Sequence, residues 1–294
     1  MTTDPGPWAI ALHGGSGVEP SRDYSKAVAH LDGLVRRIAA HLEAGDAALD
    51  VVESAVAEME ASGLYVAGRG SAPSTAGVVE LDASIMDGYR RRAGAVAAVA
   101  NAVHPVKLAR AVMDATPHVM LAGEGALAFA KSHGHPLVTD PAGYYVLPPG
   151  VEAKDLSAAL RHHGTVGAVA LDTSGRLAAA TSTGGLFGKL AGRVGDTPLI
   201  GAGTWADQTV AVSCTGSGEF FILAGGAQDV ASRMRYQGSG LQASVDGLIE
   251  DVARLGGDGG VIAVTRSGEI AFACNTPGMK RAGASSSMAP FASL

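Results

Sequence analysis

The chain has 294 residues, of which 47% are hydrophobic and 17% charged, and its net charge at pH 7 is −6. This composition is typical of a globular protein of one or two domains and excludes long disordered or collagen-like stretches. The negative balance provides no positive field for nucleic acid, and two cysteines provide neither a disulfide framework nor a CxxC site. We therefore expect no nucleic-acid partner.

The N-terminal residues lack the features of a targeting segment. No basic residue precedes the first apolar run, residues 8–12, and that run is too short for a signal peptide. No window approaches about 18 apolar residues without polar interruption. The expectation is a cytoplasmic protein that has no membrane partner.

The first half of the chain predicts a mixture of strands and helices. The run 8–12 leads into the glycine loop His13-Gly14-Gly15-Ser16-Gly17, as a buried strand would. Later elements follow from apolar spacing of about 3.6 residues or from short β-rich runs. In chain order they are helices at 25–44 and 49–59, a loop at 63–77, strands at 78–86 and 93–100, and helices at 105–113 and 121–131.

The second half begins after a proline-rich and glycine-rich stretch, residues 132–164, which predicts a linker. The elements expected beyond it are strands at 165–171 and 177–183, a strand at 210–214, helices at 227–236 and 241–255, and strands at 261–265 and 270–274. Helices lie between groups of paired strands rather than alternating with single strands. This order favours an α+β fold in which helices cover antiparallel sheets.

One alternative function uses the glycine loop alone. The backbone amides of 14–17, following a strand, could hold a phosphate in a non-catalytic nucleotide-binding protein. No helix is predicted directly after that loop, and no acidic residue is placed to bind a ribose. The usual signatures of P-loops, zinc peptidases, esterases and EF-hands are also missing from the sequence.

The position of Thr165 in the sequence indicates a candidate functional residue. Thr165 follows Gly164 directly and opens an apolar strand at the end of the linker. A threonine that starts a strand is usually structural. However, the stretches 181–185, 192–196 and 213–219 repeat hydroxyl groups and glycines at predicted strand ends, where loops present polar groups to ligands. This pattern predicts a site.

Several longer motifs occur in order along nearly the whole chain. They are His13-Gly14-Gly15, AGRGS at 67–71, ELDASIMDG at 80–88, GTVGAVALD at 164–172, ATSTGG at 180–185, GRVGDTPLIGAGTWAD at 192–207, CTGSGE at 214–219 and NTPGM at 275–279. With these motifs the chain resembles the type 2 asparaginases, plant-type N-terminal nucleophile hydrolases with isoaspartyl peptidase activity. The resemblance implies a four-layer αββα sandwich formed by an α subunit, 1–164, and a β subunit, 165–294, and assembly of two such heterodimers.

The resemblance also implies that the chain cuts itself. The Thr165 hydroxyl would attack the Gly164 carbonyl, beside the loop His13-Gly14-Gly15, and water would then release the two subunits. Cleavage frees the α-amine of Thr165, whose ordinary pKa of about 7.7 to 8.0 suits a base near neutral pH. A glycine before the threonine leaves the attacked carbonyl sterically open.

In the mature enzyme, by the same resemblance, Thr165 attacks the side-chain amide of L-asparagine or the isopeptide bond of a β-aspartyl dipeptide. The implied supporting residues are Thr183, which orients the nucleophile; the Thr215 hydroxyl and Gly216 amide, which form the oxyanion hole; Arg193, which binds the substrate α-carboxylate; and Asp196 with the Gly218 carbonyl, which bind its ammonium. Taken alone, Arg193 and Asp196 would be read as a local salt bridge, and Thr183 as an ordinary sheet residue.

The sequence departs from the family pattern at Val66, where the family usually has asparagine. A valine side chain neither donates nor accepts a hydrogen bond, so we expect weaker activity on asparagine than on β-aspartyl dipeptides. Two alternatives stay open: a glycosylasparaginase-like amidohydrolase of the same superfamily, and a homologue that, because of Val66, fails to mature and is not catalytic.

No cofactor is required by this chemistry. The family wraps a sodium ion in a loop of backbone carbonyls, which aligns in length with the carbonyls of Met59, Glu60, Ser62, Tyr65, Ala67 and Arg69. A cage of carbonyls needs no special side chains, so the sequence neither requires nor excludes the ion.

Overall fold

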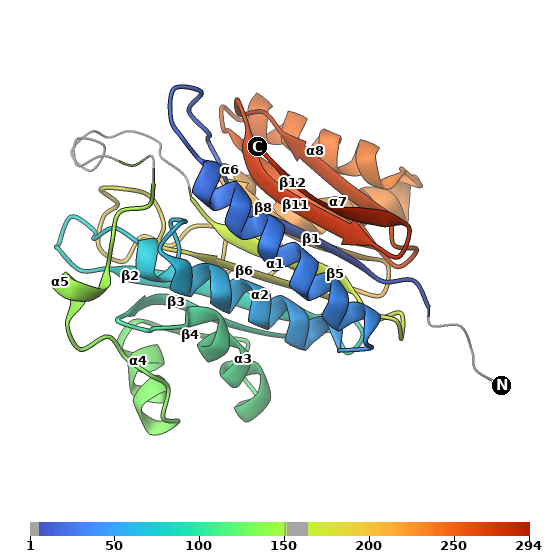
Figure 1. Ribbon diagram of the computed structural model, residues 1–294. Coiled ribbons are helices and arrows are strands. Elements are labelled where there is room, and N and C mark those ends of the chain that lie inside the picture. The colour runs from blue at the N-terminus through green and yellow to red at the C-terminus, as the bar shows by residue number, and fades with distance from the viewer. Residues whose placement is uncertain (1–5, 150, 152–163) are drawn as a thin grey trace.

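The computed structural model describes residues 6–149, 151 and 164–294. Two sheets pack face to face, and helices cover the outer face of each, so that four layers follow in the order α, β, β, α (Figure 1). The predicted α+β sandwich is thereby confirmed. Within the described ranges, no helix is long and apolar enough to cross a membrane.

The larger sheet has eight strands in the order β12-β11-β1-β5-β6-β2-β3-β4. Their bounds are β1 Ala9–Ser16, β2 Glu80–Asp87, β3 Arg92–Ala100, β4 Met120–Ala122, β5 Val166–Leu171, β6 Leu177–Thr183, β11 Met279–Ser285 and β12 Met288–Ser293. The smaller sheet has the order β10-β9-β8-β7, with β7 Thr204–Ala206, β8 Val210–Gly216, β9 Gly259–Thr265 and β10 Ile270–Cys274. All ladders are antiparallel except β3–β4.

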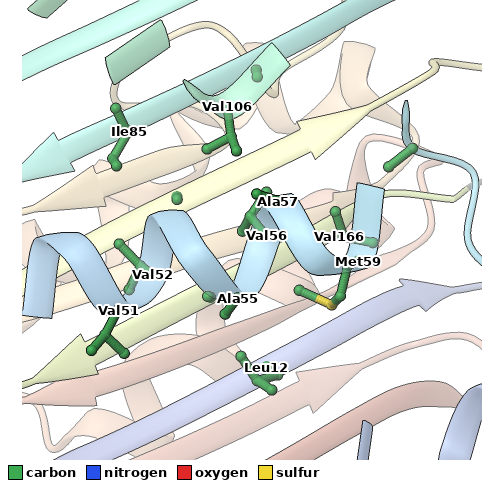
Figure 2. Close-up of a cluster of buried hydrophobic side chains, with 14 of the residues drawn as sticks. Leu12, Val51, Val52, Ala55, Val56, Ala57, Met59, Ile85, Val106 and Val166 are labelled. Atoms are coloured by element: carbon green, nitrogen blue, oxygen red, sulfur yellow. The ribbon is translucent and has the colours of Figure 1, made fainter. Parts of the chain in front are cut away.

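Helices α1 to α4 cover the larger sheet, and α6 to α8 cover the smaller one. Their bounds are α1 Ser25–Glu43, α2 Ala48–Ser62, α3 Pro105–Ala115, α4 Gly123–Ser132, the single turn α5 Pro141–Tyr144, α6 Gly218–Ala224, α7 Gly226–Ser232 and α8 Leu241–Arg254. The apolar face of α2 lies on β5 and β6, and Figure 2 shows Ala55 and Met59 of α2 on the side of the helix toward Leu12 of β1.

Both faces of the central strands are buried, which explains their uninterrupted apolar runs. In β1, Ile10 and Leu12 face the helices, whereas Ala9 and Ala11 face the smaller sheet. Small residues on the inner face allow the two sheets to approach each other. The strand expected at 8–12 is confirmed, but it runs from Ala9 to Ser16. Residues 13–16, expected in a glycine loop, therefore belong to β1, whose pairing with β11 is irregular between His13 and Ser16.

Several elements escaped the sequence prediction. Strands β11 and β12 at the C-terminus, the short strand β7 and helix α6 were not foreseen. Residues 120–122, expected to lead into a helix, instead form β4 in parallel with β3, and the helix begins at Gly123. The helix expected at 227–236 consists of α7 and a π-helical turn, Arg233–Gln237. Of the predicted linker 132–164, residues 150 and 152–163 lie outside the described residues.

Strand pairing decides what surrounds Thr165. Strand β5 starts just after Thr165 and lies between β1 and β6, both antiparallel to it. The ladder pairs His13 of β1 with Gly167, and Ser182 of β6 with Val166. Because antiparallel neighbours end where β5 begins, the glycines at the end of β1 and the hydroxyls at the end of β6 meet at the Gly164–Thr165 bond.

Candidate active site

The Gly164–Thr165 peptide bond directly precedes β5, a central strand of the larger sheet. Thr165 is buried there, with only 5% of its surface exposed. The glycines at the end of β1 lie against this bond. A Cβ built on Gly15 would stand 3.2 Å from both the Gly164 Cα and the Thr165 nitrogen, and Gly15 has a φ of +98°. A side chain at position 15 would therefore be strained and would press on this bond.

Thr183, at the end of β6, connects the hydroxyl of Thr165 to the carbonyl of Gly164. The Thr165 Oγ1 donates to the Thr183 Oγ1 at 3.2 Å, and the Thr183 hydroxyl donates to the Gly164 carbonyl at 2.7 Å. The Gly185 amide donates to the same Thr183 oxygen at 2.9 Å. One hydroxyl thus holds the candidate nucleophile and polarises the carbonyl next to it.

His13 contributes a neutral imidazole to the site. Its Nδ1 lies 3.2 Å from the Thr165 carbonyl oxygen and its Nε2 lies 2.9 Å from the Ser213 Oγ. Burial, opposed by the hydrogen bond to Thr165 and aided by the charge of Lys280, lowers the pKa of His13 to about 3. Since a carbonyl only accepts, Nδ1 carries the proton and Nε2 accepts from Ser213.

A row of buried hydroxyls continues from His13 between the two sheets. Ser213 Oγ lies 2.7 Å from Thr181 Oγ1, Thr204 Oγ1 donates to Thr181 at 2.6 Å, and Ser84 Oγ lies 2.7 Å from Thr204. Each hydroxyl has one proton, so a donation from Ser213 to His13 requires Thr181 to donate to Ser213. The sequence analysis missed this row, because its members are spread over four strands, β2, β6, β7 and β8.

A small pocket of about 220 Å³ opens beside the Thr165 hydroxyl. Its lining includes Thr165, Thr183, Arg193, Asp196 and Gly216. Five residues that the resemblance implied are therefore brought together, although their positions in the sequence span 51 residues from Thr165 to Gly216. The pocket carries one cation and one carboxylate, the two charges that a zwitterionic amino acid needs.

Arg193 is held in place by a carboxylate that the sequence analysis did not single out. Its Nε and a terminal nitrogen donate to the two carboxylate oxygens of Glu219 at 2.8 and 2.7 Å. Glu219 opens α6, inside the CTGSGE motif. The local Arg193–Asp196 ion pair that was weighed as an alternative is not formed within 4.0 Å in the described part of the chain. The two hydrogen bonds to Glu219 thereby fix the orientation of the Arg193 guanidinium group at the wall of the pocket.

Asp196 is a buried carboxylate with an open hydrogen-bonding position. Its Oδ2 has no hydrogen-bond partner among the described residues. Burial, opposed by the nearby charge of Arg193, raises the pKa of Asp196 to about 7. Gly218 lies beside it, since a Cβ built there would be 2.7 Å from the Asp196 Oδ1. An ammonium group in the pocket would supply the missing partner.

The two residues implied for the oxyanion hole differ in their position. Gly216, with a φ of +140°, lines the pocket, whereas Thr215 is fully buried behind it. The Thr215 Oγ1 accepts a hydrogen bond from the Ser16 amide at 3.4 Å, and its own proton stays available for donation. Ser16 is the last residue of β1, so the end of this strand also holds the Thr215 side chain.

Val66 lies directly on Gly164. A Cβ built on Gly164 would be 2.3 Å from the Val66 Cβ, and the Val66 side chain belongs to a small apolar cluster with Ala72 and Phe187. Gly14 is similarly covered by the Tyr65 ring, 2.5 Å from a built Cβ. The departure from the family pattern therefore stands at the attacked carbonyl itself.

The loop after α2 offers the carbonyl oxygens that a sodium ion would need. Built Cβ atoms on Gly68 and Gly70 would stand 2.5 Å from the Glu60 oxygen and 2.0 Å from the Tyr65 oxygen, so the loop folds tightly over these carbonyls. The Tyr65 carbonyl accepts a hydrogen bond from Ala67 and retains a second lone pair. Oxygen ligands suit a hard cation, so this donor set fits the ion.

Known proteins resemble this chain over nearly its whole length. A family model described as Asparaginase matches residues 6–145 and 148–290. The chain is 46% identical to an isoaspartyl peptidase of Salmonella typhimurium, covering 93% of this chain and 94% of the relative. It is 43% identical to a plant-type L-asparaginase of Pyrobaculum calidifontis, covering 92% and 95%, and 40% identical to a probable isoaspartyl peptidase/L-asparaginase 2 of Arabidopsis thaliana, covering 94% and 95%.

Proposed function

This chain belongs to the asparaginase family, and on that premise we propose that it cuts itself before Thr165 and then hydrolyses L-asparagine and β-aspartyl dipeptides. One observation carries the proposal: the Thr165 hydroxyl, hydrogen-bonded to Thr183, opens into a pocket whose walls hold Arg193 and Asp196. A side-chain amide attached to a zwitterion is the chemistry that such a pocket accommodates.

Self-cleavage uses groups that are already in contact. The Thr165 Oγ attacks the Gly164 carbonyl carbon, the bond to the Thr165 nitrogen breaks, and that nitrogen takes up the proton lost by the hydroxyl. The Thr183 hydroxyl, 2.7 Å from the Gly164 oxygen, stabilises the negative charge that develops on it. Water then hydrolyses the ester, which leaves a carboxylate on Gly164 and a free amine on Thr165.

The same nucleophile then acts on the substrate. The free α-amine of Thr165 takes the hydroxyl proton while the oxygen attacks the side-chain carbonyl, and it passes that proton to the leaving amine. The Thr215 hydroxyl and the Gly216 amide receive the oxyanion. Water then hydrolyses the β-aspartyl ester on Thr165, which releases aspartate and restores the hydroxyl. Arg193 binds the α-carboxylate and Asp196 the ammonium, so only a substrate with both groups is held with its amide at Thr165.

Four further statements belong to this proposal. Two cut heterodimers assemble, the protein works in the cytoplasm, and no cofactor takes part in the reaction. The carbonyls of the loop after α2 hold a sodium ion that fixes the loop carrying Val66.

Product release tests the proposed function. Matured protein is expected to release ammonia from L-asparagine and leucine from β-aspartyl-leucine, whereas α-aspartyl-leucine stays intact because its scissile carbonyl is not a side-chain group. A preparation of Thr165→Ala provides the matched control. If the cut wild type releases no product from either substrate, the proposed function is wrong.

Val66 is expected to depress activity on asparagine in particular. Its apolar side chain lies on the Gly164 position and offers no hydrogen bond to the reacting carbonyl. Val66→Asn should therefore increase kcat/KM for L-asparagine about tenfold or more, since one well-placed donor is worth about 2.7 to 4 kcal/mol in a transition state. Steady-state kinetics on asparagine and β-aspartyl-leucine measure this change.

The matched control is Val66→Ala, which removes the same contacts and adds no polar group, and should not reproduce the gain. A wild type that turns over asparagine as well as Val66→Asn does would contradict the prediction. A wild type that never cuts itself, beside a Val66→Asn variant that does, would instead favour the maturation-deficient alternative.

A further inference from the structure

A second cavity, of about 430 Å³, also borders the cleavage site. Of the described residues, Gly164 alone lines both this cavity and the pocket that holds Asp196. The walls of the second cavity include Arg22, Tyr24, Val66 and Lys280. The reaction described above uses none of its polar groups, although the two spaces meet at the residue that is separated from Thr165 by cleavage.

Lys280 places a positive charge in this second cavity. The residue is only 8% exposed, and its Nζ lies 4.9 Å from the centroid of the Tyr24 ring. Among the residues that the structure describes, no carboxylate lies within 4.0 Å of that nitrogen. Burial lowers the pKa of Lys280 to about 8, so the amine is still protonated at neutral pH.

Among the described residues, the Lys280 ammonium contacts an aromatic ring and has no carboxylate within 4.0 Å. Its burial is therefore incompletely compensated, because the cation–π contact replaces only part of its hydration. Arg22, on the same wall, already pairs with Glu19 at 3.0 Å. An anion that enters this cavity would therefore bind to the ammonium of Lys280.

The amino acid released from a β-aspartyl dipeptide is expected to depart toward this cavity. The Thr165 amine must protonate the departing nitrogen, so that nitrogen has to lie within hydrogen-bonding reach of it. In the uncut chain, the atoms attached to the Thr165 nitrogen are those of Gly164. A leaving amino acid that takes the space next to this nitrogen, once Gly164 is free to move, enters the cavity that Lys280 lines.

We propose that this cavity binds the α-carboxylate of the amino acid released from a β-aspartyl dipeptide, and that Lys280 is its ligand. The inference rests on the proposed function and adds a specificity for the leaving group. Asparagine, which releases ammonia, has nothing to place there. The carboxylate that self-cleavage leaves on Gly164 has the same chemistry and is the competing occupant.

Two substrates that differ only in the leaving-group charge test the inference: β-aspartyl-leucine and β-aspartyl-leucinamide. We expect the cut wild type to prefer the acid about tenfold in kcat/KM, the effect of one charge-assisted hydrogen bond. Lys280→Met should reduce this preference to about one, and Lys280→Arg should keep most of it. The mass of each variant first shows that both fragments are present.

A preference for the acid that is the same in wild type and Lys280→Met would overturn the inference. If Lys280 instead binds the Gly164 carboxylate, the Lys280→Met change affects both substrates alike and leaves the ratio unchanged, which also overturns it. Failure of the proposed function gives a different result. The wild type would then release neither leucine from β-aspartyl-leucine nor leucinamide from β-aspartyl-leucinamide, and the inference would fall with the proposed function.

Discussion

Thr165→Ala is expected to remain a single chain of full mass under conditions in which the wild type separates into residues 1–164 and 165–294. The variant has no oxygen that can attack the Gly164 carbonyl, and the surrounding contacts are otherwise kept. Activity on both substrate classes should fall about a thousandfold or more, since nucleophile and base are lost together. Intact mass measured over time, with a denaturing gel, follows the cleavage.

Graded variants separate chemistry from folding. Thr165→Ser keeps the hydroxyl and should still be cut, whereas Thr183→Ala should be cut about a hundredfold or more slowly because the Gly164 oxygen loses the donor at 2.7 Å. Thr183→Ser restores that donor. Cleavage of Thr165→Ala at the same bond would show that another group attacks, and would remove Thr165 from the proposal.

Asp196→Asn is expected to change activity and stability in opposite directions. The amide cannot pair with the substrate ammonium, so we expect KM for L-asparagine to rise about a hundredfold. The same change removes a buried carboxylate whose Oδ2 has no described partner. The free enzyme should therefore become more stable, as is common where a binding site holds an uncompensated group.

The sign of the pH dependence follows from burial. The pKa of Asp196 is raised from 3.8 to about 7 in the folded protein, so between these pH values the folded state binds more protons than the unfolded state. The wild type therefore loses stability as pH rises through this window, by about 4 kcal/mol in total. The variant escapes that loss. Denaturant unfolding at pH 4, 6 and 8 should show a gap between variant and wild type that widens with pH.

Asp207→Asn is the matched control. Burial raises the pKa of Asp207, but hydrogen bonds from Thr209, Val210 and Trp205 outweigh it and lower that pKa. Because these bonds favour the ionised form, Asp207→Asn should lose stability at pH 8 instead of gaining it. If the difference in the free energy of unfolding between Asp196→Asn and wild type is the same at all three pH values, ionisation of Asp196 does not destabilise the folded protein, and the prediction is wrong.

Local patterns predicted much of the fold. Helices α1, α2 and α8 have apolar residues at helical spacing over three or more turns, and the packed face is the apolar one. Strand β12 gave no such signal, because its side chains are only partly buried and Pro290 interrupts the pattern. An edge strand tolerates that proline, but only the pairing with β11 reveals the strand.

The amino-acid sequence by itself determined the family, the layered fold class and the threonine that follows a glycine, since these reside in motifs and in periodicities of neighbouring residues. The tertiary structure decided which groups meet: Glu219 on Arg193, Ser213 on His13 and Val66 on Gly164. It also decided that Asp196 is buried and that Lys280 lines the same cavity as Gly164. The physical reason is that burial and polar pairing depend on which strand ends share an edge of the sheet, and this is set by packing between distant segments.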